Sequence, residues 1–253
     1  MSHQVINVPG RCPAPAQEVA PAPGIIPRWK RALDFCCIAI AAPAWLFVGA
    51  VIYVFVRLVS PGPAFFKQER IGYRGRRFEC IKFRTMVVNA DTGIHQERLS
   101  QLMSSNKPMT KLDADGDKRL IRFGRVLRSL GLDELPQILN VLRGDMSLVG
   151  PRPCLPYEYE QYLPHHRERL AVVPGLTGLW QVSGKNRTTF EEMVDLDVQY
   201  AAQQSLFLDL KIIALTPFAI LQQVWDGLKR RKARFSSELS ARRDSKGALN
   251  PQS

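Results

Sequence analysis

The stretch LDELPQILNVLRGDMSLVGPRP, residues 132–153, decides the fold of this chain. Its apolar residues recur at three- and four-residue spacing, as in a short helix: Leu135, Ile138, Leu139 and Leu142. Pro136 fits only the first turn of such a helix, because its missing N–H has no partner there. Gly144 is suited to cap the other end. The pattern therefore places Asp133 and Glu134 at the helix N-terminus.

A second short helix is predicted just before this stretch, from about residue 118 to Gly131, which ends it. One face is apolar: Leu120, Phe123, Leu127 and Leu130. A basic band runs beside that face: Arg119, Arg122, Arg125 and Arg128. The two carboxylates then lie between a positive helix end and arginines, surroundings that lower carboxylate pKa values and suit phosphate. The alternative is that Asp133 is an ordinary N-cap and Glu134 complements the helix dipole.

The whole string closely resembles the core of a family of bacterial sugar transferases, the small-domain, monotopic phosphoglycosyl transferases. These include the undecaprenyl-phosphate sugar phosphotransferases that begin surface polysaccharide synthesis. Three other segments extend the resemblance: SPGPAFFKQERIGYRGRRFECIKFRTM (60–86), VPGLTGLWQVSGKN (173–186) and FEEMVDLDVQY (190–200). It covers roughly residues 28–224.

Composition favours an anionic partner, because the formal net charge of the 253 residues is +12. An anionic membrane face and a nucleotide-type substrate both qualify. Nucleic acid is not expected, since no recognised nucleic-acid motif is present. The cysteines are odd in number and lack zinc or redox spacing, which suits a reducing compartment: Cys12, Cys36, Cys37, Cys80 and Cys154.

Composition shifts divide the chain into four parts. Residues 1–27 are Pro/Ala-rich and predict a disordered leader. Residues 28–59 predict a membrane helix, and residues 60–227 a catalytic domain at the cytoplasmic face. Within that domain, the apolar run Leu206–Val224 contains Asp209, Lys211 and Pro217, which favours an amphipathic helix in the membrane interface over a second span. Residues 228–253 predict a basic, disordered tail drawn to anionic lipids.

The membrane helix has a 22-residue core without charge, Phe35–Val56, which is long enough to span a bilayer. Pro43 interrupts it and should kink it. Basic residues flank both ends, and the positive-inside rule places both in the cytoplasm. A re-entrant helix satisfies this, and the resembling family has one, broken at a Ser-Pro pair. Here Ala42 precedes the proline, so an ordinary transmembrane span is kept as the alternative.

Two strands are predicted after the membrane helix, Ala64–Lys67 and Phe78–Phe83, joined by a basic turn from Gly72 to Arg77. The turn arginines suit anionic lipid headgroups. Lys82 and Arg84 alternate onto one face of the second strand and are candidates to hold a diphosphate. In the resembling family the KFRTM segment belongs to the active site.

The remaining segments carry weaker signals. Residues 89–117 predict a polar helix-and-loop excursion, and residues 154–169 an amphipathic helix. His165 and His166 have no third ligand in register and are expected to be exposed rather than metal-bound. Trp180 and Gln181 lie in a turn-rich loop that either packs as a connector or faces a nucleotide, with Trp180 stacking on the base and Gln181 hydrogen-bonding it.

The resemblance implies a reaction and a set of roles. A sugar phosphate would move from a UDP-sugar to undecaprenyl phosphate, with Mg²⁺, at the cytoplasmic face of the bacterial inner membrane. Asp133 would be the nucleophile, and Glu134, with Asp133, would hold the metal. Charge stabilisation falls to Lys82, Arg84, Arg128 and Arg152, because cations, and arginine above all, grip phosphate. Asp197 occupies a recurring family position and would bind sugar, support the metal or pair with an arginine.

The expected architecture is α/β but mainly helical. It is that of a monotopic membrane protein with a re-entrant N-terminal helix, a small basic β-hairpin and amphipathic interface helices. Three other functions compete: a membrane-anchored basic scaffold or lipid-binding protein, a nucleic-acid binder, and a degenerate transferase kept for assembly. The sugar and the oligomeric state are left open.

Overall fold

The computed structural model describes residues 26–87, 119–184 and 187–248, together with 97, 100–103, 105, 107 and 108. Side chains are described as far as residue 229. All but the last two residues of the predicted leader, and most of the predicted excursion at 89–117, lie outside these ranges.

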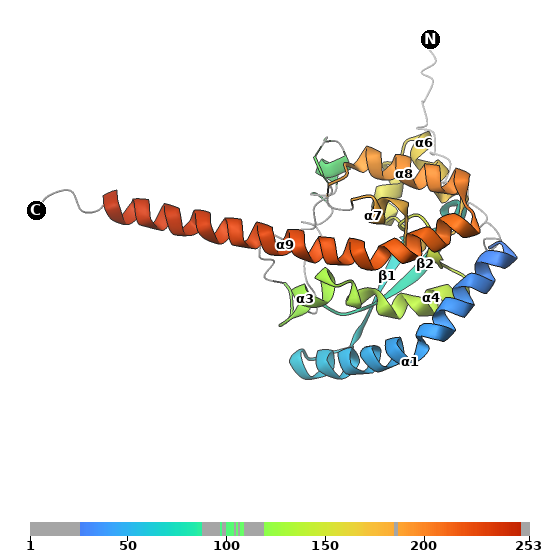
Figure 1. The fold of residues 1–253 in the computed structure, drawn as a ribbon, viewed down its shortest axis with the longest axis horizontal. Helices are drawn as coiled ribbons and strands as arrows, with labels where there is room; N and C mark the ends of the chain where they lie inside the picture. Colours follow the sequence, from blue (N-terminus) through green and yellow to red (C-terminus); the bar gives the residue numbers. More distant parts are fainter. Residues whose placement is uncertain are drawn as a thin grey trace, which may run out of the picture.

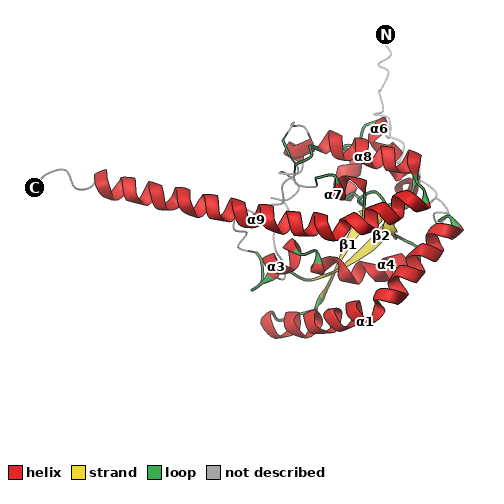
Figure 2. Cartoon of the chain, in the orientation of Figure 1, coloured by secondary structure: helices red, strands yellow, loops and turns green. Residues whose placement is uncertain are grey.

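The chain is mainly helical, as predicted, and its described residues form two small sheets (Figure 2). The helices are α1 (Arg28–Val59), α3 (Gly124–Ser129), α4 (Ile138–Arg143), α5 (Pro156–Glu160), α6 (Pro164–Arg167), α7 (Leu179–Val182), α8 (Phe190–Gln203) and α9 (Leu206–Ala248), with 3-10 turns η1 (Tyr73–Gly75), η3 (Leu132–Gln137) and η4 (Glu168–Ala171). Strands β1 (Phe65–Ile71) and β2 (Arg77–Phe83) form the predicted hairpin. The parallel pair β3 (Ser147–Val149) and β4 (Gly175–Thr177) was not predicted, because three residues are too few to show a periodicity.

Helix α1 is continuous through Pro43, and Figure 1 shows it as two arms that meet at an angle. A proline inside a helix removes one backbone hydrogen bond and bends it. Large apolar side chains on α1 are exposed, including Ile40, Phe47 and Leu58. The helix is long and apolar enough to cross a membrane. A re-entrant path requires such a bend, and that path stays a prediction.

The first arm of α1 is joined to the rest of the molecule by buried polar groups. Lys30 is 1% exposed and pairs with Asp209 at the start of α9. Its ammonium also donates to the hydroxyl of Tyr200 on α8, at 2.9 Å. One turn further along α1, the carboxylate of Asp34 accepts hydrogen bonds from the Ser147 hydroxyl and the Leu148 N–H, both at 2.9 Å. These contacts make α1 part of the body that carries β3.

Helix α9 is the second long apolar helix, and its segment Leu206–Lys229 also meets the length and composition of a membrane span. The helix continues past Pro217 and runs to Ala248. It therefore differs from the disordered tail predicted from residue 228 onward. The physical reason is propensity, because the basic segment is rich in Lys, Arg and Ala, which favour helix.

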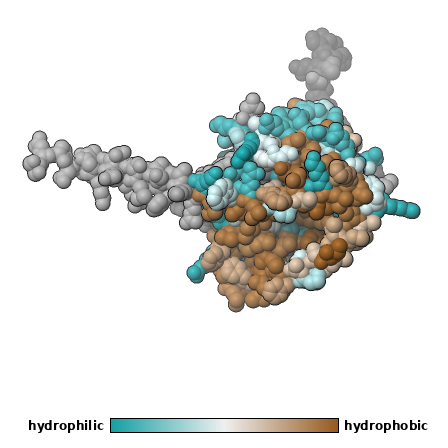
Figure 3. Space-filling view, viewed as in Figure 1, coloured by the Kyte–Doolittle hydropathy of each residue, from teal (hydrophilic) through white to brown (hydrophobic). Residues whose placement is uncertain are grey.

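The hairpin runs from the apolar side of the molecule to the polar side. At its open end the Phe65 ring lies 5.7 Å from that of Tyr53 on α1 and 5.3 Å from that of Phe83. Its turn, η1, packs against η4 at the other end. Seven-residue strands are about 20 Å long, so the turn arginines lie far from the second arm of α1. Figure 3 shows apolar atoms gathered over the half of the surface that contains α1, and polar atoms over α6 and α8.

Candidate active site

The Asp133–Glu134 pair lies where the sequence predicts, in the first turn of η3, which leads directly into α4. Gly131 precedes that turn with φ 70°, a left-handed conformation that ends α3 and redirects the chain. Gly144 ends α4 in the same way, with φ 88°. The first helix is shorter than predicted and begins at Gly124, because Phe123 is itself left-handed. Asp133 is 7% exposed, so its carboxylate is held in a largely protected site.

Lys82 is brought to this pair by the hairpin. Its ammonium donates to Glu134 Oε1 at 2.9 Å, and both side chains are partly buried. The strand is held in register by Asn140 on α4, whose amide donates to the Glu79 carbonyl at 2.7 Å and accepts from the Ile81 N–H at 3.1 Å. Asn140 is fully buried, and sequence analysis did not identify it. A polar residue inside the apolar pattern of α4 was the available signal.

Three cations and Glu134 share one neighbourhood around Cys80. Burial raises the pKa of the Cys80 thiol, Lys82, Arg70 and Arg152 lower it, and Glu134 raises it. Lys82, Arg152 and Glu134, which are distant in sequence, thus all act on the same buried thiol, and Lys82 also contacts Glu134 directly. Arg70 was not among the predicted site residues. The available signal was its position in the segment 60–86, just before the basic turn.

Arg152 is held rigidly in the turn Gly150–Pro153. Its Nη1 lies 3.3 Å from a carboxylate oxygen of Glu158, while a quarter of its side chain stays exposed. The turn itself is fastened through its carbonyls. Arg70 donates to the Pro153 carbonyl at 3.0 Å, and Arg169 to the Arg152 carbonyl at 3.2 Å. A preorganised guanidinium of this kind suits recognition of an oxyanion.

Asp197 is part of the buried core and does not face a substrate, which corrects the prediction that it binds the substrate. Its side chain is fully buried and forms an ion pair with the equally buried Arg169. Burial raises the pKa of Asp197 to about 6, although Arg169 and the backbone N–H of Arg152 lower it. The pairing with an arginine was one of the three predicted roles. Asp197 therefore acts on the site through Arg169 and the Arg152 turn.

Arg84 is also occupied by the fold rather than turned to a phosphate. It is 6% exposed, and its two terminal nitrogens donate to the carbonyls of Pro61 at 2.6 Å and Ser60 at 2.8 Å. It thereby fastens the turn that follows α1. Arg128 lies half-buried in the last turn of α3, shortly before the carboxylate pair.

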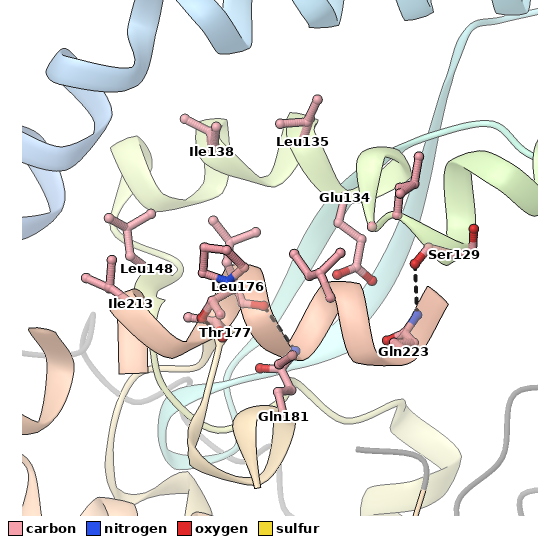
Figure 4. Close-up of a pocket in the computed structure, with 16 residues that line it drawn as sticks. Ser129, Glu134, Leu135, Ile138, Leu148, Leu176, Thr177, Gln181, Ile213 and Gln223 are labelled. Atoms are coloured by element: carbon pink, nitrogen blue, oxygen red, sulfur yellow. Dashed lines mark hydrogen bonds between the residues drawn. The ribbon is translucent and has the colours of Figure 1, made fainter. Parts of the chain in front are cut away.

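A cavity of about 330 Å³ opens beside Glu134, between the η3–α4 segment and α9 (Figure 4). Gln181 on α7 lines it, and its amide donates to the Leu176 carbonyl at 3.2 Å. Trp180 is 4% exposed and packs in the core cluster with Phe190 and Tyr162. The sequence left open whether this loop packs as a connector or faces a nucleotide. Trp180 packs in the core, whereas Gln181 lines the cavity beside Glu134.

Of the two histidines, His165 is exposed as predicted, whereas His166 is buried. His166 is 4% exposed, and its Nε2 lies 3.1 Å from Glu191, which also approaches His165 at 3.4 Å. The His166 Nδ1 accepts a hydrogen bond from the Leu163 N–H at 3.2 Å. The neutral ring must then carry its proton on Nε2 and donate it to Glu191. In that tautomer His166 and Glu191 are joined by a hydrogen bond. The His166 Nε2 then has no lone pair with which to bind a metal.

Asp133 and Glu134 fit a magnesium ion by the chemistry of their donors. Mg²⁺ prefers carboxylate oxygens and is commonly held by one or two of them, with substrate phosphates completing the shell. The two side chains are adjacent in η3, one mostly buried and one a third exposed. The nearby cations offset the negative charge of the two carboxylates, so an anionic substrate can bind beside them.

Comparison with known proteins places the chain in a family. Residues 26–223 match the family described as bacterial sugar transferase. Galactosyl transferase CpsE of Streptococcus agalactiae is 45% identical over 163 residues, which is 63% of this chain and 35% of that protein. The undecaprenyl-phosphate galactose phosphotransferase of Salmonella typhimurium is 37% identical over 205 residues, or 77% of this chain and 40% of the relative. The exopolysaccharide production protein ExoY of Sinorhizobium fredii is 38% identical over 187 residues, or 74% and 83%.

The chain thus spans two fifths or less of the length of the first two relatives, and most of the third. The family match covers well over half of the chain, including the hairpin, the carboxylate pair and the first part of α9. This chain belongs to the bacterial sugar transferase family.

Proposed function

We propose that the protein transfers a sugar 1-phosphate from a UDP-sugar to polyprenyl phosphate, of the undecaprenyl type, giving UMP and a polyprenyl-diphosphate sugar. The observation that carries the proposal is the Asp133–Glu134 pair, in which Glu134 contacts Lys82, on a body that also presents two apolar helices. Arg152 belongs to the same charged neighbourhood around Cys80. Such a site can receive a soluble nucleotide sugar and a lipid phosphate together. The names of the Salmonella and Sinorhizobium relatives support this reaction and a role in exopolysaccharide synthesis.

The proposed chemistry has two displacements at one phosphorus atom. A carboxylate oxygen of Asp133 attacks the β-phosphorus of the UDP-sugar, and the bond from that phosphorus to the bridging oxygen breaks. UMP leaves with the bond's electron pair, and the sugar phosphate stays on Asp133. An oxygen of the polyprenyl phosphate then attacks the same phosphorus and releases the Asp133 carboxylate. Carboxylates are known phosphoryl nucleophiles when nearby cations neutralise the substrate.

The other residues of the site have supporting roles. Lys82 and Arg152 bind the diphosphate oxygens, and Glu134 is oriented by its hydrogen bond from Lys82. Asp133 and Glu134 would hold Mg²⁺, which supplies further charge neutralisation when bound. Arg128, at the end of α3, is placed to add positive charge on the side of the pair nearest the preceding helix.

The membrane arrangement belongs to the same proposal. Helix α1 enters the cytoplasmic leaflet of the bacterial inner membrane and returns to the same face through its bend, and α9 lies in the interface among anionic lipids. Cysteines placed singly at Pro27 and at the exposed Pro61, in a background without native cysteines, test the path. Both should react with an impermeant thiol reagent from the cytoplasmic side. Labelling of the two ends from opposite sides would establish a span instead.

The reaction is tested by UMP release from purified protein with Mg²⁺, undecaprenyl phosphate and a panel that includes UDP-galactose and UDP-glucose. Wild type should release UMP with at least one donor, and Asp133→Asn should not. Asp195→Asn, an exposed aspartate on α8, is the matched control and should behave as wild type. Mass spectrometry should find a phospho-sugar on the Asp133 peptide before lipid is added. Turnover that survives in Asp133→Asn would exclude the covalent route, and a folded wild type inactive with every donor would favour a membrane scaffold.

A further inference from the structure

The cavity beside Glu134 is apolar along most of its length. Side chains from η3, α4, the β3–β4 region and α9 line it, among them Leu135, Ile138, Leu148, Leu176, Ile213 and Ile220 (Figure 4). Its volume of about 330 Å³ falls in the range of small-molecule sites, about 300–1,000 Å³. Unpaired polar groups of a ligand would lose free energy against such a wall. The lining therefore selects a hydrocarbon.

One end of the cavity differs from the rest, because it is polar and belongs to the active site. The Glu134 side chain points into it, and Lys82 contacts the same carboxylate. Gln181 also faces this end, and its Oε1 is buried without a hydrogen-bond partner among the described residues. Next to Glu134, Gln223 of α9 donates to the Ser129 carbonyl at 3.1 Å and ties α9 to α3 (Figure 4). A ligand in the cavity would thus have one end at the proposed catalytic carboxylates.

The wall formed by α9 connects the cavity to the lipid-facing surface. The same helix that contributes Ile213 and Ile220 exposes Phe207, Phe218 and Leu221 on its outer side, each at least 65% exposed. The apolar segment of α9 also meets the length and hydropathy of a membrane helix. The cavity wall and the exposed apolar face therefore belong to the same helix, an arrangement that suits a hydrocarbon chain coming from the bilayer.

We propose that this cavity binds the isoprenoid units next to the phosphate of the polyprenyl phosphate acceptor. The inference rests on the proposed function, and it adds the position of the acceptor: tail along α9, phosphate at the Glu134 and Lys82 end. The unpaired Gln181 Oε1 would accept a hydrogen bond from a donor group of the substrate assembled at that end. The uridine of the donor is not suited to this cavity, since its polar edges would face leucine and isoleucine.

A pair of identical substitutions on α9 tests the position. Ala219 lines the cavity, whereas Ala214 lies on the exposed surface of the same helix. Ala219→Phe fills the space, so it should weaken binding of undecaprenyl phosphate to the detergent-purified protein by about tenfold or more, since burying a few methylene groups is worth that much. Ala214→Phe should bind as wild type. Equal binding by all three proteins would overturn the inference.

Wild-type protein provides a second measurement that does not depend on the folding of a variant. Undecaprenyl phosphate carrying a diazirine near its phosphate end should crosslink to peptides that contain residues 135–138 and 213–220. Crosslinks to other peptides would overturn the proposal. Competition by an equal concentration of phosphatidylglycerol that abolishes these crosslinks would also overturn it, because it would show that the cavity binds acyl chains in general. Both assays measure binding alone. If they succeed while no donor yields UMP, the cavity is a polyprenyl site and the proposed transfer reaction is wrong.

Discussion

At the scale of the residue, the cations of the hairpin have different surroundings, and the surroundings decide what each does. Lys82 is partly buried and contacts Glu134, whereas Lys67 on β1 pairs with Glu79 at 2.7 Å with 61% of each side chain exposed. Arg84 is closed into the fold by two carbonyls. Of these three cations, Lys82 alone is both partly buried and in contact with the carboxylate pair. Burial strengthens an electrostatic contact because the local dielectric constant is lower.

Lys82→Met should therefore lower kcat/KM for the donor by about 100-fold, the usual effect of removing one preorganised charge from a site. Lys67→Met is the matched control on the same hairpin. It should change kcat/KM less than about threefold, because exposed ion pairs contribute little. UMP release under subsaturating UDP-sugar measures both. Similar losses in the two variants would show that the hairpin as a whole, rather than Lys82, matters.

Asp197 predicts a dependence of stability on pH. Its pKa is raised by burial, against the effect of Arg169, to about 6 in the folded protein, and it is about 3.9 in an unfolded chain. Between these values the folded protein binds a proton that the unfolded chain does not. The free energy of unfolding of wild type relative to Asp197→Asn should therefore rise as the pH falls through about 6 towards about 4, and be constant above about pH 7.

Chemical unfolding at several pH values measures this difference. The exposed Asp195→Asn on α8 serves as the control, and its difference from wild type should show no step near pH 6. A relative stability of wild type that falls on acidification would mean that Arg169 controls the pKa of Asp197 and lowers it below its usual value.

At the scale of the element, η3 depends on the turn that introduces it. Gly131 is left-handed, with φ 70°, and a Cβ added there would meet no atom within 4 Å. The glycine is thus required for its backbone conformation and not for space. That conformation ends α3 and points the following peptide groups so that Asp133 and Glu134 fall in the first turn of η3.

Gly131→Ala should lower the free energy of unfolding by about 1–2 kcal/mol, the strain of a left-handed alanine. Gly227→Ala, inside α9 and equally free of close atoms, should be neutral or stabilising by up to about 1 kcal/mol, because alanine favours helix. Thermal unfolding in detergent compares the two. Equal midpoints would show that η3 relaxes to another backbone conformation at no cost.

At the scale of the whole molecule, the two long apolar helices and the segment that carries the carboxylate pair form one body. The Lys30–Asp209 pair joins α1 to α9. The Tyr200 hydroxyl on α8 donates to Asp209 at 2.7 Å and lies 3.2 Å from the Val149 carbonyl of β3. Helix α9 in turn forms one wall of the cavity beside Glu134. The position of the apolar surface relative to the carboxylates is therefore set by a few buried polar contacts.

Lys30→Met should lower the free energy of unfolding by about 3–5 kcal/mol, because it leaves the buried Asp209 without its cation. Lys211→Met, an exposed lysine on α9, is the matched control and should shift the unfolding midpoint little. The double variant Lys30→Met with Asp209→Leu should recover part of the loss. A double variant less stable than Lys30→Met alone would contradict this explanation.

Local patterns predicted the local structure well. The apolar spacing, Pro136 and two glycines were enough to place Asp133 and Glu134 in the first turn of a helix, because helix ends are determined by neighbouring residues. Alternation predicted the hairpin, and the charge-free run predicted α1. The three-residue strands β3 and β4 were missed, since their pairing joins segments distant in sequence.

The sequence by itself determined which residues could carry the chemistry, since the carboxylate pair, the cations and the apolar runs are each readable over a few turns of chain. Only the tertiary structure decided which of them meet. It joined Lys82 to Glu134, withdrew Arg84 and Asp197 into buried contacts, and brought α9 against η3 to form the cavity. The physical reason is that burial and ion pairing depend on long-range packing, which periodicity does not encode.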